Sequence, residues 1–136
     1  MKTLYQTTVS VTGGRNGHVK SEDGILELDV RIPKEMGGAG GHTNPEQLFA
    51  AGYAACFDSA LNLVMQREKV VSTSVLTATV GLTSNGEGGF SLWVHLAAHL
   101  PGVDPARALE LVQKAHAICP YSNATRGNIE VRLEVI

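Results

Sequence analysis

Residues 44–67 read NPEQLFAAGYAACFDSALNLVMQR and predict one long helix that decides the fold. Asn44 can cap this helix and Pro45 suits its first position, while Thr43 with Glu46 offers an alternative capping box. A helix from Pro45 to about Arg67 would be roughly 33 Å long. Its side chains are apolar or small nearly all round, which predicts burial on most sides. One short chain cannot easily cover such a helix, so we expect a homodimer that shares it.

The same stretch also raises the question of a membrane span. Gln47–Met65 holds 19 residues with a single formal charge, Asp58. Its polar residues, Gly52 and several alanines lower the hydrophobicity, which favours a buried core helix over a span. The segment Met1–Thr8 lacks the apolar core of a signal peptide, so we expect a cytoplasmic protein.

Alternating apolar and polar residues predict strands on both sides of the helix. The expected strands are Thr3–Thr12, His18–Lys20, Ile25–Ile32, Ser74–Asn85, Phe90–Leu100 and Asn128–Ile136. A second helix opens at Asp104 and Pro105 and ends near Cys119, because Pro120 biases the residue before it away from helical geometry. We expect Tyr121–Gly127 to be a connector. The order β-β-β-α-β-β-α-β predicts a single α+β domain over residues 1–136.

Composition excludes some classes of function. The 136 residues carry 11 basic and 13 acidic side chains, a net charge of −2, with no long run of one sign. A protein held by phosphate contacts needs a basic face, and a polybasic membrane anchor needs a basic cluster. We therefore expect no nucleic-acid partner and no membrane partner.

The chain has two cysteines, Cys56 and Cys119, and neither belongs to a C-x-x-C pair. A zinc ribbon and a thioredoxin-type motif are therefore absent. In a cytosolic protein the two are either inert buried thiols or a redox-active pair. His116 and Cys119 have a spacing that could ligate a metal, but no further ligand lies at suitable spacing, so we predict no metal site.

A buried thiol without a cation has a raised pKa and is inert. Arg15 is the best candidate cation, because it lies in the glycine-rich turn Gly13–Gly17, where the backbone can approach another element closely. It could equally be a solvated turn charge. Glu46 lies at the head of the long helix, where a carboxylate is also favoured simply by the helix dipole.

Three segments make the sequence recognisable. They are TGGRNG at 12–17, NPEQLFAAGYAACF at 44–57 and CPYSNA at 119–124. With these motifs the whole chain resembles the organic hydroperoxide resistance (Ohr) family of the OsmC-like group. The resemblance implies an intertwined homodimer with long buried central helices and sites at the subunit interface. It implies a thiol-dependent peroxidase that reduces alkyl and lipid hydroperoxides, with a lipoylated protein as dithiol reductant and no bound cofactor.

By the same resemblance Cys56 would be the peroxidatic residue and Cys119 the resolving one, with Arg15 and Glu46 as their activating pair. We expect apolar walls near Cys56, formed by its neighbours Leu48, Phe49, Tyr53 and Phe57. Glu46 and Cys56 are ten residues apart, roughly 15 Å along a straight helix. Either Gly52 breaks the helix or the activating pair comes at least partly from the partner chain, which we favour.

Two rival functions remain open. One is an OsmC-like thiol peroxidase with a different substrate or reductant. The other is a non-enzymatic dimeric redox sensor or apolar-ligand carrier that uses the same pocket.

Overall fold

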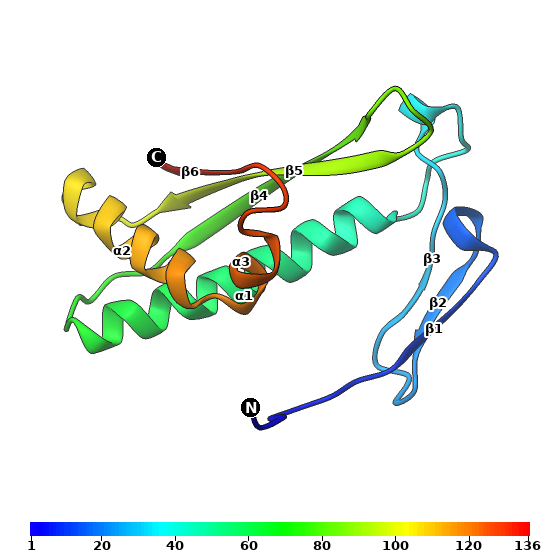
Figure 1. Cartoon of the computed structure of the whole chain (residues 1–136). Helices are drawn as coiled ribbons and strands as arrows, with labels where there is room; N and C mark the ends of the chain where they lie inside the picture. The colour runs from blue at the N-terminus through cyan, green and yellow to red at the C-terminus, as the bar shows by residue number, and fades with distance from the viewer. The chain divides into compact units, whose positions relative to one another are not determined.

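A computed structural model describes residues 1–136 as a mixed α+β fold with two sheets (Figure 1). The chain forms two compact units, Met1–Leu48 and Phe49–Ile136. The expected element order is confirmed, with one short helix added near the C-terminus. That the whole chain acts as a single domain stays a prediction.

The unit Met1–Leu48 is built on a small antiparallel sheet. Its strands, in spatial order, are β1 (Val9–Thr12), β2 (His18–Ser21) and β3 (Glu27–Asp29), with single 3-10 turns at η1 (Gly14–Asn16) and η2 (Lys34–Met36). The predicted strands Thr3–Thr12 and Ile25–Ile32 were too long. Both pair with β2, which has four residues, so their hydrogen-bonded ladders end where β2 ends. Beyond β3, Val30 adds one isolated bridge to Thr43.

Helix α1 runs from Pro45 to Arg67, as predicted. Asn44 is its cap, because the Asn44 side chain accepts a hydrogen bond of 2.9 Å from the Gln47 backbone N–H. The helix is continuous through Gly52, so the alternative in which Gly52 breaks it is wrong.

Within one chain α1 buries only one face, in line with the expectation that one chain cannot cover this helix, and its burial on most sides in a homodimer stays a prediction. The buried face is Tyr53, Phe57, Ala60, Leu61, Val64 and Met65. Ala51, Ala55 and Ser59 lie one turn apart on a face that stays exposed. Helix α1 is long and apolar enough to span a membrane. A third of its most apolar segment is buried within this chain.

The unit Phe49–Ile136 packs helices on one face of a second sheet (Figure 1). Its strands, in spatial order, are β4 (Val75–Ser84), β5 (Phe90–His99) and β6 (Val131–Val135). β4 is antiparallel to β5, and β6 is parallel to β5. Val94, Leu96 and Ala98, which alternate along β5, are buried in one core with residues of α1 and α2 (Pro105–Ile118).

Two helices follow each other closely near the C-terminus. Asp104 caps α2 by accepting from the backbone N–H groups of Ala106 and Arg107, as expected. Cys119 then adopts an extended conformation (φ −63°, ψ 124°), and α3 (Pro120–Thr125) begins at once. The prediction of an irregular connector over Tyr121–Gly127 is therefore wrong for its first five residues.

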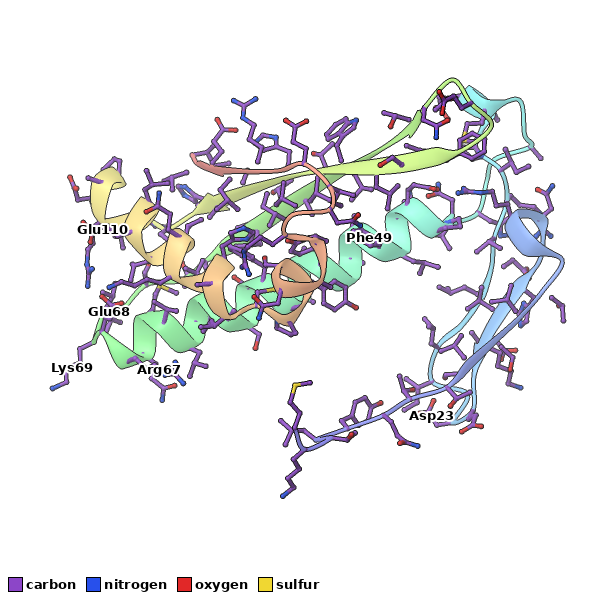
Figure 2. All side chains as sticks on the ribbon, in the orientation of Figure 1. Asp23, Phe49, Arg67, Glu68, Lys69 and Glu110 are labelled. Atoms are coloured by element: carbon purple, nitrogen blue, oxygen red, sulfur yellow. The ribbon has the colours of Figure 1, made fainter.

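An ion cluster ties the far end of α1 to α2. Glu68, which follows α1, pairs with Arg107 at 2.8 Å and with Lys114 at 2.8 Å, and Arg107 also pairs with Glu110 at 3.1 Å. Figure 2 labels Glu68 and Glu110 at this end of the unit. Within this cluster Arg107 and Glu68 form a second arginine–glutamate pair, which can be compared with Arg15 and Glu46.

Candidate active site

In the unit Met1–Leu48 the guanidinium of Arg15 donates two parallel hydrogen bonds to the carboxylate of Glu46. Arg15 Nη1 donates to Glu46 Oε2 at 2.8 Å, and Nη2 donates to Oε1 at 2.6 Å. The pairing that the family resemblance implies is thus formed, between residues 31 positions apart along the chain. The bidentate geometry fixes the plane of the guanidinium as well as its position.

Each partner stabilises the charge of the other. Hydrogen bonding from Arg15 holds the pKa of the Glu46 carboxyl below its usual range, and Glu46 raises the pKa of Arg15 in return. The Arg15 side chain keeps 36% of its surface exposed while that of Glu46 keeps 16%. The carboxylate is therefore an anchor, and one edge of the guanidinium is left available.

The turn that carries Arg15 depends on its glycines. Gly13 has a positive φ of 76°, and a Cβ on Gly17 would lie 1.6 Å from the carbonyl oxygen of Thr12. No side chain fits in either place without moving the backbone. The glycines allow a tight turn that points Arg15 at the start of α1.

In the unit Phe49–Ile136 the fold brings two sulfurs together from positions 63 residues apart. The Cys119 thiol donates to Cys56 Sγ over 3.7 Å, and both residues are free thiols. Cys119 is fully buried, whereas Cys56 is half-buried. A molecule arriving from solvent therefore meets Cys56 first.

Three groups act on the Cys56 thiol. Burial raises its pKa, the backbone N–H of Tyr121 lowers it, and the neighbouring Cys119 thiol raises it further. No cation is among these groups. Tyr121 lies at the second position of α3, where a backbone N–H has no partner within the helix and is free to face the sulfur.

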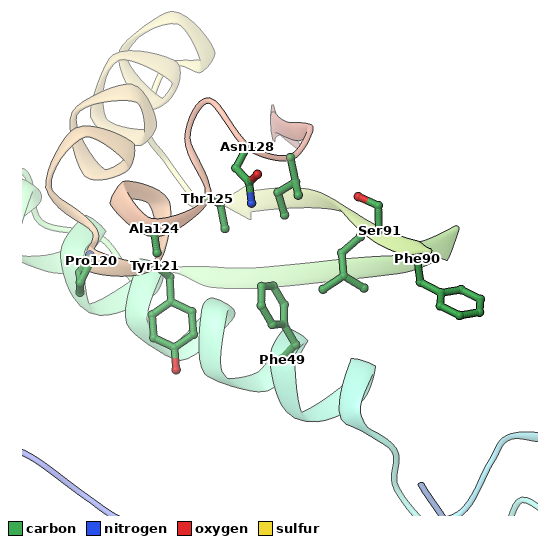
Figure 3. Close-up of a pocket in the computed structure, with 10 residues that line it drawn as sticks. Phe49, Phe90, Ser91, Pro120, Tyr121, Ala124, Thr125 and Asn128 are labelled. Atoms are coloured by element: carbon green, nitrogen blue, oxygen red, sulfur yellow. The ribbon is translucent and has the colours of Figure 1, made fainter. Parts of the chain in front are cut away.

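A cavity of about 730 Å³ lies in the unit Phe49–Ile136, with walls from α1, β5 and the α3 region (Figure 3). Its lining residues are Phe49, Phe90, Ser91, Leu92, Pro120, Tyr121, Ala124, Thr125, Asn128 and Ile129. Pro120 and Tyr121 directly follow Cys119, and Tyr121 also contacts Cys56 through its backbone N–H. Neither cysteine lines the cavity, but Pro120 and Tyr121 connect its wall to the two cysteines, and most of that wall is apolar.

Four wall residues, Leu48, Phe49, Tyr53 and Phe57, were expected from their closeness to Cys56 in sequence, and most of them do not line this cavity. Only Phe49 lines the cavity. Tyr53 and Phe57 are fully buried in the core instead, because they lie on the face of α1 that packs against the sheet and α2. The other lining residues come from β5 and the α3 region, and no local pattern in the sequence links these segments to Cys56.

No group of three or more potential ligands is placed to hold a metal ion. The pair singled out earlier is used otherwise, because His116 Nδ1 lies 2.8 Å from Ser122 Oγ. His18 lies between Asp29 and Glu27, at 2.8 and 2.9 Å from their carboxylate oxygens. These carboxylates raise the pKa of His18, Asp29 by more than Glu27.

Known proteins match this chain in sequence over nearly its whole length. A family model described as OsmC-like protein matches residues 37–134. The chain is similar to the organic hydroperoxide resistance protein OhrA of Bacillus subtilis (strain 168), with 51% identity over 97% of this chain and 96% of that protein.

Solved structures agree in fold and in sequence. An organic hydroperoxide resistance protein from Elizabethkingia anophelis, with thiocyanate bound, superposes with a TM-score of 0.94 at 58% identity, covering 99% of this chain and 98% of that one. A candidate organic hydroperoxide resistance protein from Vibrio cholerae, with captopril in one of its active sites, gives a TM-score of 0.95 at 54% identity, covering 99% and 94%. The chain therefore belongs to the OsmC-like family, in its group of organic hydroperoxide resistance (Ohr) proteins.

Proposed function

We propose that this protein is a thiol-dependent peroxidase that reduces organic hydroperoxides to alcohols, with Cys56 as the peroxidatic residue and Cys119 as the resolving residue. The observation that carries the proposal is the sulfur pair, two free thiols 3.7 Å apart with unequal exposure. The more exposed sulfur of Cys56 suits attack on a substrate. The fully buried sulfur of Cys119 suits a later, internal step.

In the first step the Cys56 thiolate attacks one peroxide oxygen of the substrate. The S–O bond forms as the O–O bond breaks, so the sulfur loses two electrons to the peroxide. The leaving alkoxide takes a proton and departs as the alcohol, and Cys56 is left as a sulfenic acid. A guanidinium placed beside the leaving oxygen would stabilise its developing negative charge.

In the second step Cys119 attacks the oxidised sulfur of Cys56. The S–S bond forms, the S–O bond breaks, and the hydroxyl leaves with the Cys119 proton as water. The sulfurs must close from 3.7 Å to a bond length of about 2 Å, a small movement at the junction between two helices. The short distance between the two free thiols supports this step.

In the third step an external dithiol, such as the lipoyl group of a lipoylated protein, restores the two thiols by exchange and becomes a cyclic disulfide. The captopril found in one active site of the Vibrio cholerae relative is a small thiol, which supports access of thiols to the corresponding place here. A disulfide that is reduced in every cycle suits the reducing cytoplasm, where we place the protein.

Activation of Cys56 requires a positive charge, because burial raises the pKa of its thiol. We assign that charge to the Arg15–Glu46 pair of the partner chain in a homodimer. Glu46 and Cys56 lie on one unbroken helix, roughly 15 Å apart along its axis, which is too far for one guanidinium to contact both. The exposed small residues Ala51, Ala55 and Ser59 allow close approach of a second α1.

The cavity indicates the class of substrate. An apolar wall gains free energy by burying alkyl surface, about 25 cal/mol per Å². Hydrogen peroxide has no alkyl part to bury, whereas alkyl and lipid hydroperoxides do. We therefore expect the latter to be preferred.

The test is intact mass after one equivalent of tert-butyl hydroperoxide. An internal disulfide lowers the mass by about 2 Da, whereas a lone sulfenic acid raises it by about 16 Da. Repeated turnover with a dithiol then separates the peroxidase from a redox sensor, which would react once, and from an apolar-ligand carrier, which would not react. An unchanged mass would refute the proposal.

A further inference from the structure

A buried chain of hydroxyl groups lies next to the two sulfurs. The Tyr53 hydroxyl lies 2.8 Å from Ser122 Oγ and 3.1 Å from Thr125 Oγ1. Ser122 Oγ is also 2.8 Å from His116 Nδ1. Tyr53 and Ser122 are fully buried. We call Tyr53, Ser122, Thr125 and His116 the hydroxyl network; the peroxidase steps above assign it no role.

The hydroxyl network joins the same segments as the sulfur pair. Tyr53 lies three residues before Cys56, on a neighbouring position of the same face of α1. Ser122 lies three residues after Cys119, in α3. A shift of α3 along α1 would therefore change the Tyr53–Ser122 distance and the Cys56–Cys119 distance together.

The backbone of Cys119 does not itself hold α3 on α1. Its N–H donates to the Ala115 carbonyl in α2, and its carbonyl accepts from the Asn123 N–H in α3. Apart from the contacts of the sulfurs, the hydrogen bonds between α3 and α1 are those of the Tyr53 hydroxyl. The ring of Tyr53 adds a contact with the Tyr121 ring, at 5.7 Å between centroids.

Each hydroxyl proton of the hydroxyl network has an acceptor within hydrogen-bonding distance. Tyr53 can donate to Ser122 and Ser122 to His116 Nδ1, while Thr125 can donate either to Tyr53 or to the Ser122 carbonyl at 3.3 Å, so no buried hydroxyl is without a partner. Burial lowers the pKa of His116, with Arg126 adding to the effect, which keeps the imidazole neutral and its Nδ1 able to accept. Removing one hydroxyl leaves a buried polar group unpaired, which costs more than the net value of the bond.

We propose that Tyr53 and Ser122 are positioning residues that hold Cys119 against Cys56 for disulfide formation. The inference rests on the proposed peroxidase cycle and concerns its second step alone. Neither residue touches the substrate oxygen or either sulfur through a hydrogen bond. Their effect should therefore appear in the closing of the S–S bond and be absent from the first oxidation of Cys56.

The experiment compares the wild-type protein with Tyr53→Phe, Ser122→Ala and the double variant in buffers of reduced and oxidised dithiothreitol. Alkylation and mass spectrometry give the fraction of Cys56–Cys119 disulfide at equilibrium. We expect each single variant to shift the equilibrium about fivefold toward the thiols, in the range of one neutral hydrogen bond. The double variant should fall little below the worse single variant, since both lose the same bond.

Tyr5→Phe is the matched control, because it removes the same atom from an exposed tyrosine. It should leave the equilibrium unchanged. A second readout is the rate of Cys56 oxidation by tert-butyl hydroperoxide in each variant placed on a Cys119→Ser background, which should match that background without the second substitution. A variant that merely damaged the fold would slow this reaction too.

The outcomes separate the two proposals. If the wild-type protein forms no internal disulfide in these buffers or with hydroperoxide, the peroxidase cycle itself fails, and the positioning role with it. If the wild-type protein forms the disulfide and Tyr53→Phe and Ser122→Ala form it as readily, the cycle stands and the positioning role is overturned. Additive losses in the double variant would also overturn it.

Discussion

The candidate site residues of the two units lie in surroundings that favour opposite charge states: ionised for Arg15 and Glu46, neutral for the Cys56 thiol. In Met1–Leu48 the Arg15–Glu46 pair stabilises two charges, with the pKa of Glu46 lowered and that of Arg15 raised. In Phe49–Ile136 the Cys56 thiol is buried and its pKa is raised. At the candidate site the first unit supplies a paired cation and no thiol, and the second supplies a thiol with no cation among the groups that act on it. We assign the site to a pair of chains because Glu46 and Cys56 lie roughly 15 Å apart on one unbroken helix.

Two histidines repeat the contrast. His18 lies in the open sheet of the first unit between two carboxylates, which raise its pKa. His116 lies in the second unit, where burial lowers its pKa and Arg126 adds to the effect. The same side chain is thus stabilised as a cation in one unit and as a neutral base in the other.

The largest expected effect is at the thiol. Cys56→Ser should reduce hydroperoxide consumption by on the order of 1,000-fold or more, because the covalent step is lost. Stopped-flow measurement with tert-butyl hydroperoxide checks this. Cys119→Ser is the matched control: it should still consume about one equivalent and then stall, leaving Cys56 open to overoxidation. An undiminished rate in Cys56→Ser would remove the thiol from the mechanism.

The next effect is at the charge. Arg15→Ala should slow the first oxidation by about 100-fold or more and shift its pH dependence to higher pH, because the thiolate and the leaving alkoxide lose their cation. Absorbance of the thiolate near 240 nm across a pH series, measured on a Cys119→Ser background where Cys56 is the one thiol, gives the pKa of Cys56. Arg107→Ala, which breaks a comparable pair with Glu68, should leave rate and pKa unchanged. Equal effects from both arginines would point to general electrostatics.

A smaller effect tests whether Cys56 and the Arg15–Glu46 pair of one site come from the same chain or from two chains. Mixing Cys56→Ser subunits with Glu46→Ala subunits should restore about a quarter of the wild-type activity if the pair acts across the dimer. The reason is that half of the dimers then hold one complete site of two. Each variant alone, and each mixed with itself, provides the background. Mixed dimers with no more activity than that background would place thiol and charge in the same chain.

The smallest effect concerns the two histidines. The raised pKa of His18 stabilises the fold below about pH 6.5, and this contribution is lost as the pH rises through the raised value. The lowered pKa of His116 works in the opposite sense, because stability is complete above about pH 6.5 and falls as the pH drops below it. Tm measured from pH 5 to 8 should therefore become more acid-sensitive in His18→Gln and less so in His116→Asn, by a few degrees. Parallel curves for all three proteins would contradict the contrast.

Local sequence signals predicted most of the elements. Helix α1 begins and ends where expected, because Asn44 and Pro45 mark its start without help from distant residues. The inward face of β5 follows from its alternation. Helix α3 was missed, because six residues carry too little periodicity to be recognised and its contact with Tyr53 comes from 69 positions away.

Local sequence identified the available groups, which are two thiols without a metal motif, one arginine in a glycine turn and one glutamate at a helix start. The Arg15–Glu46 pairing was implied by the resemblance to the Ohr family, because the residues alone left a solvated arginine and a capping glutamate open. Tertiary structure decided the distance of 3.7 Å between the sulfurs, the Tyr121 N–H beside Cys56 and the residues that line the cavity. The physical reason is that periodicity reports which face of an element is apolar, whereas only packing decides which faces meet.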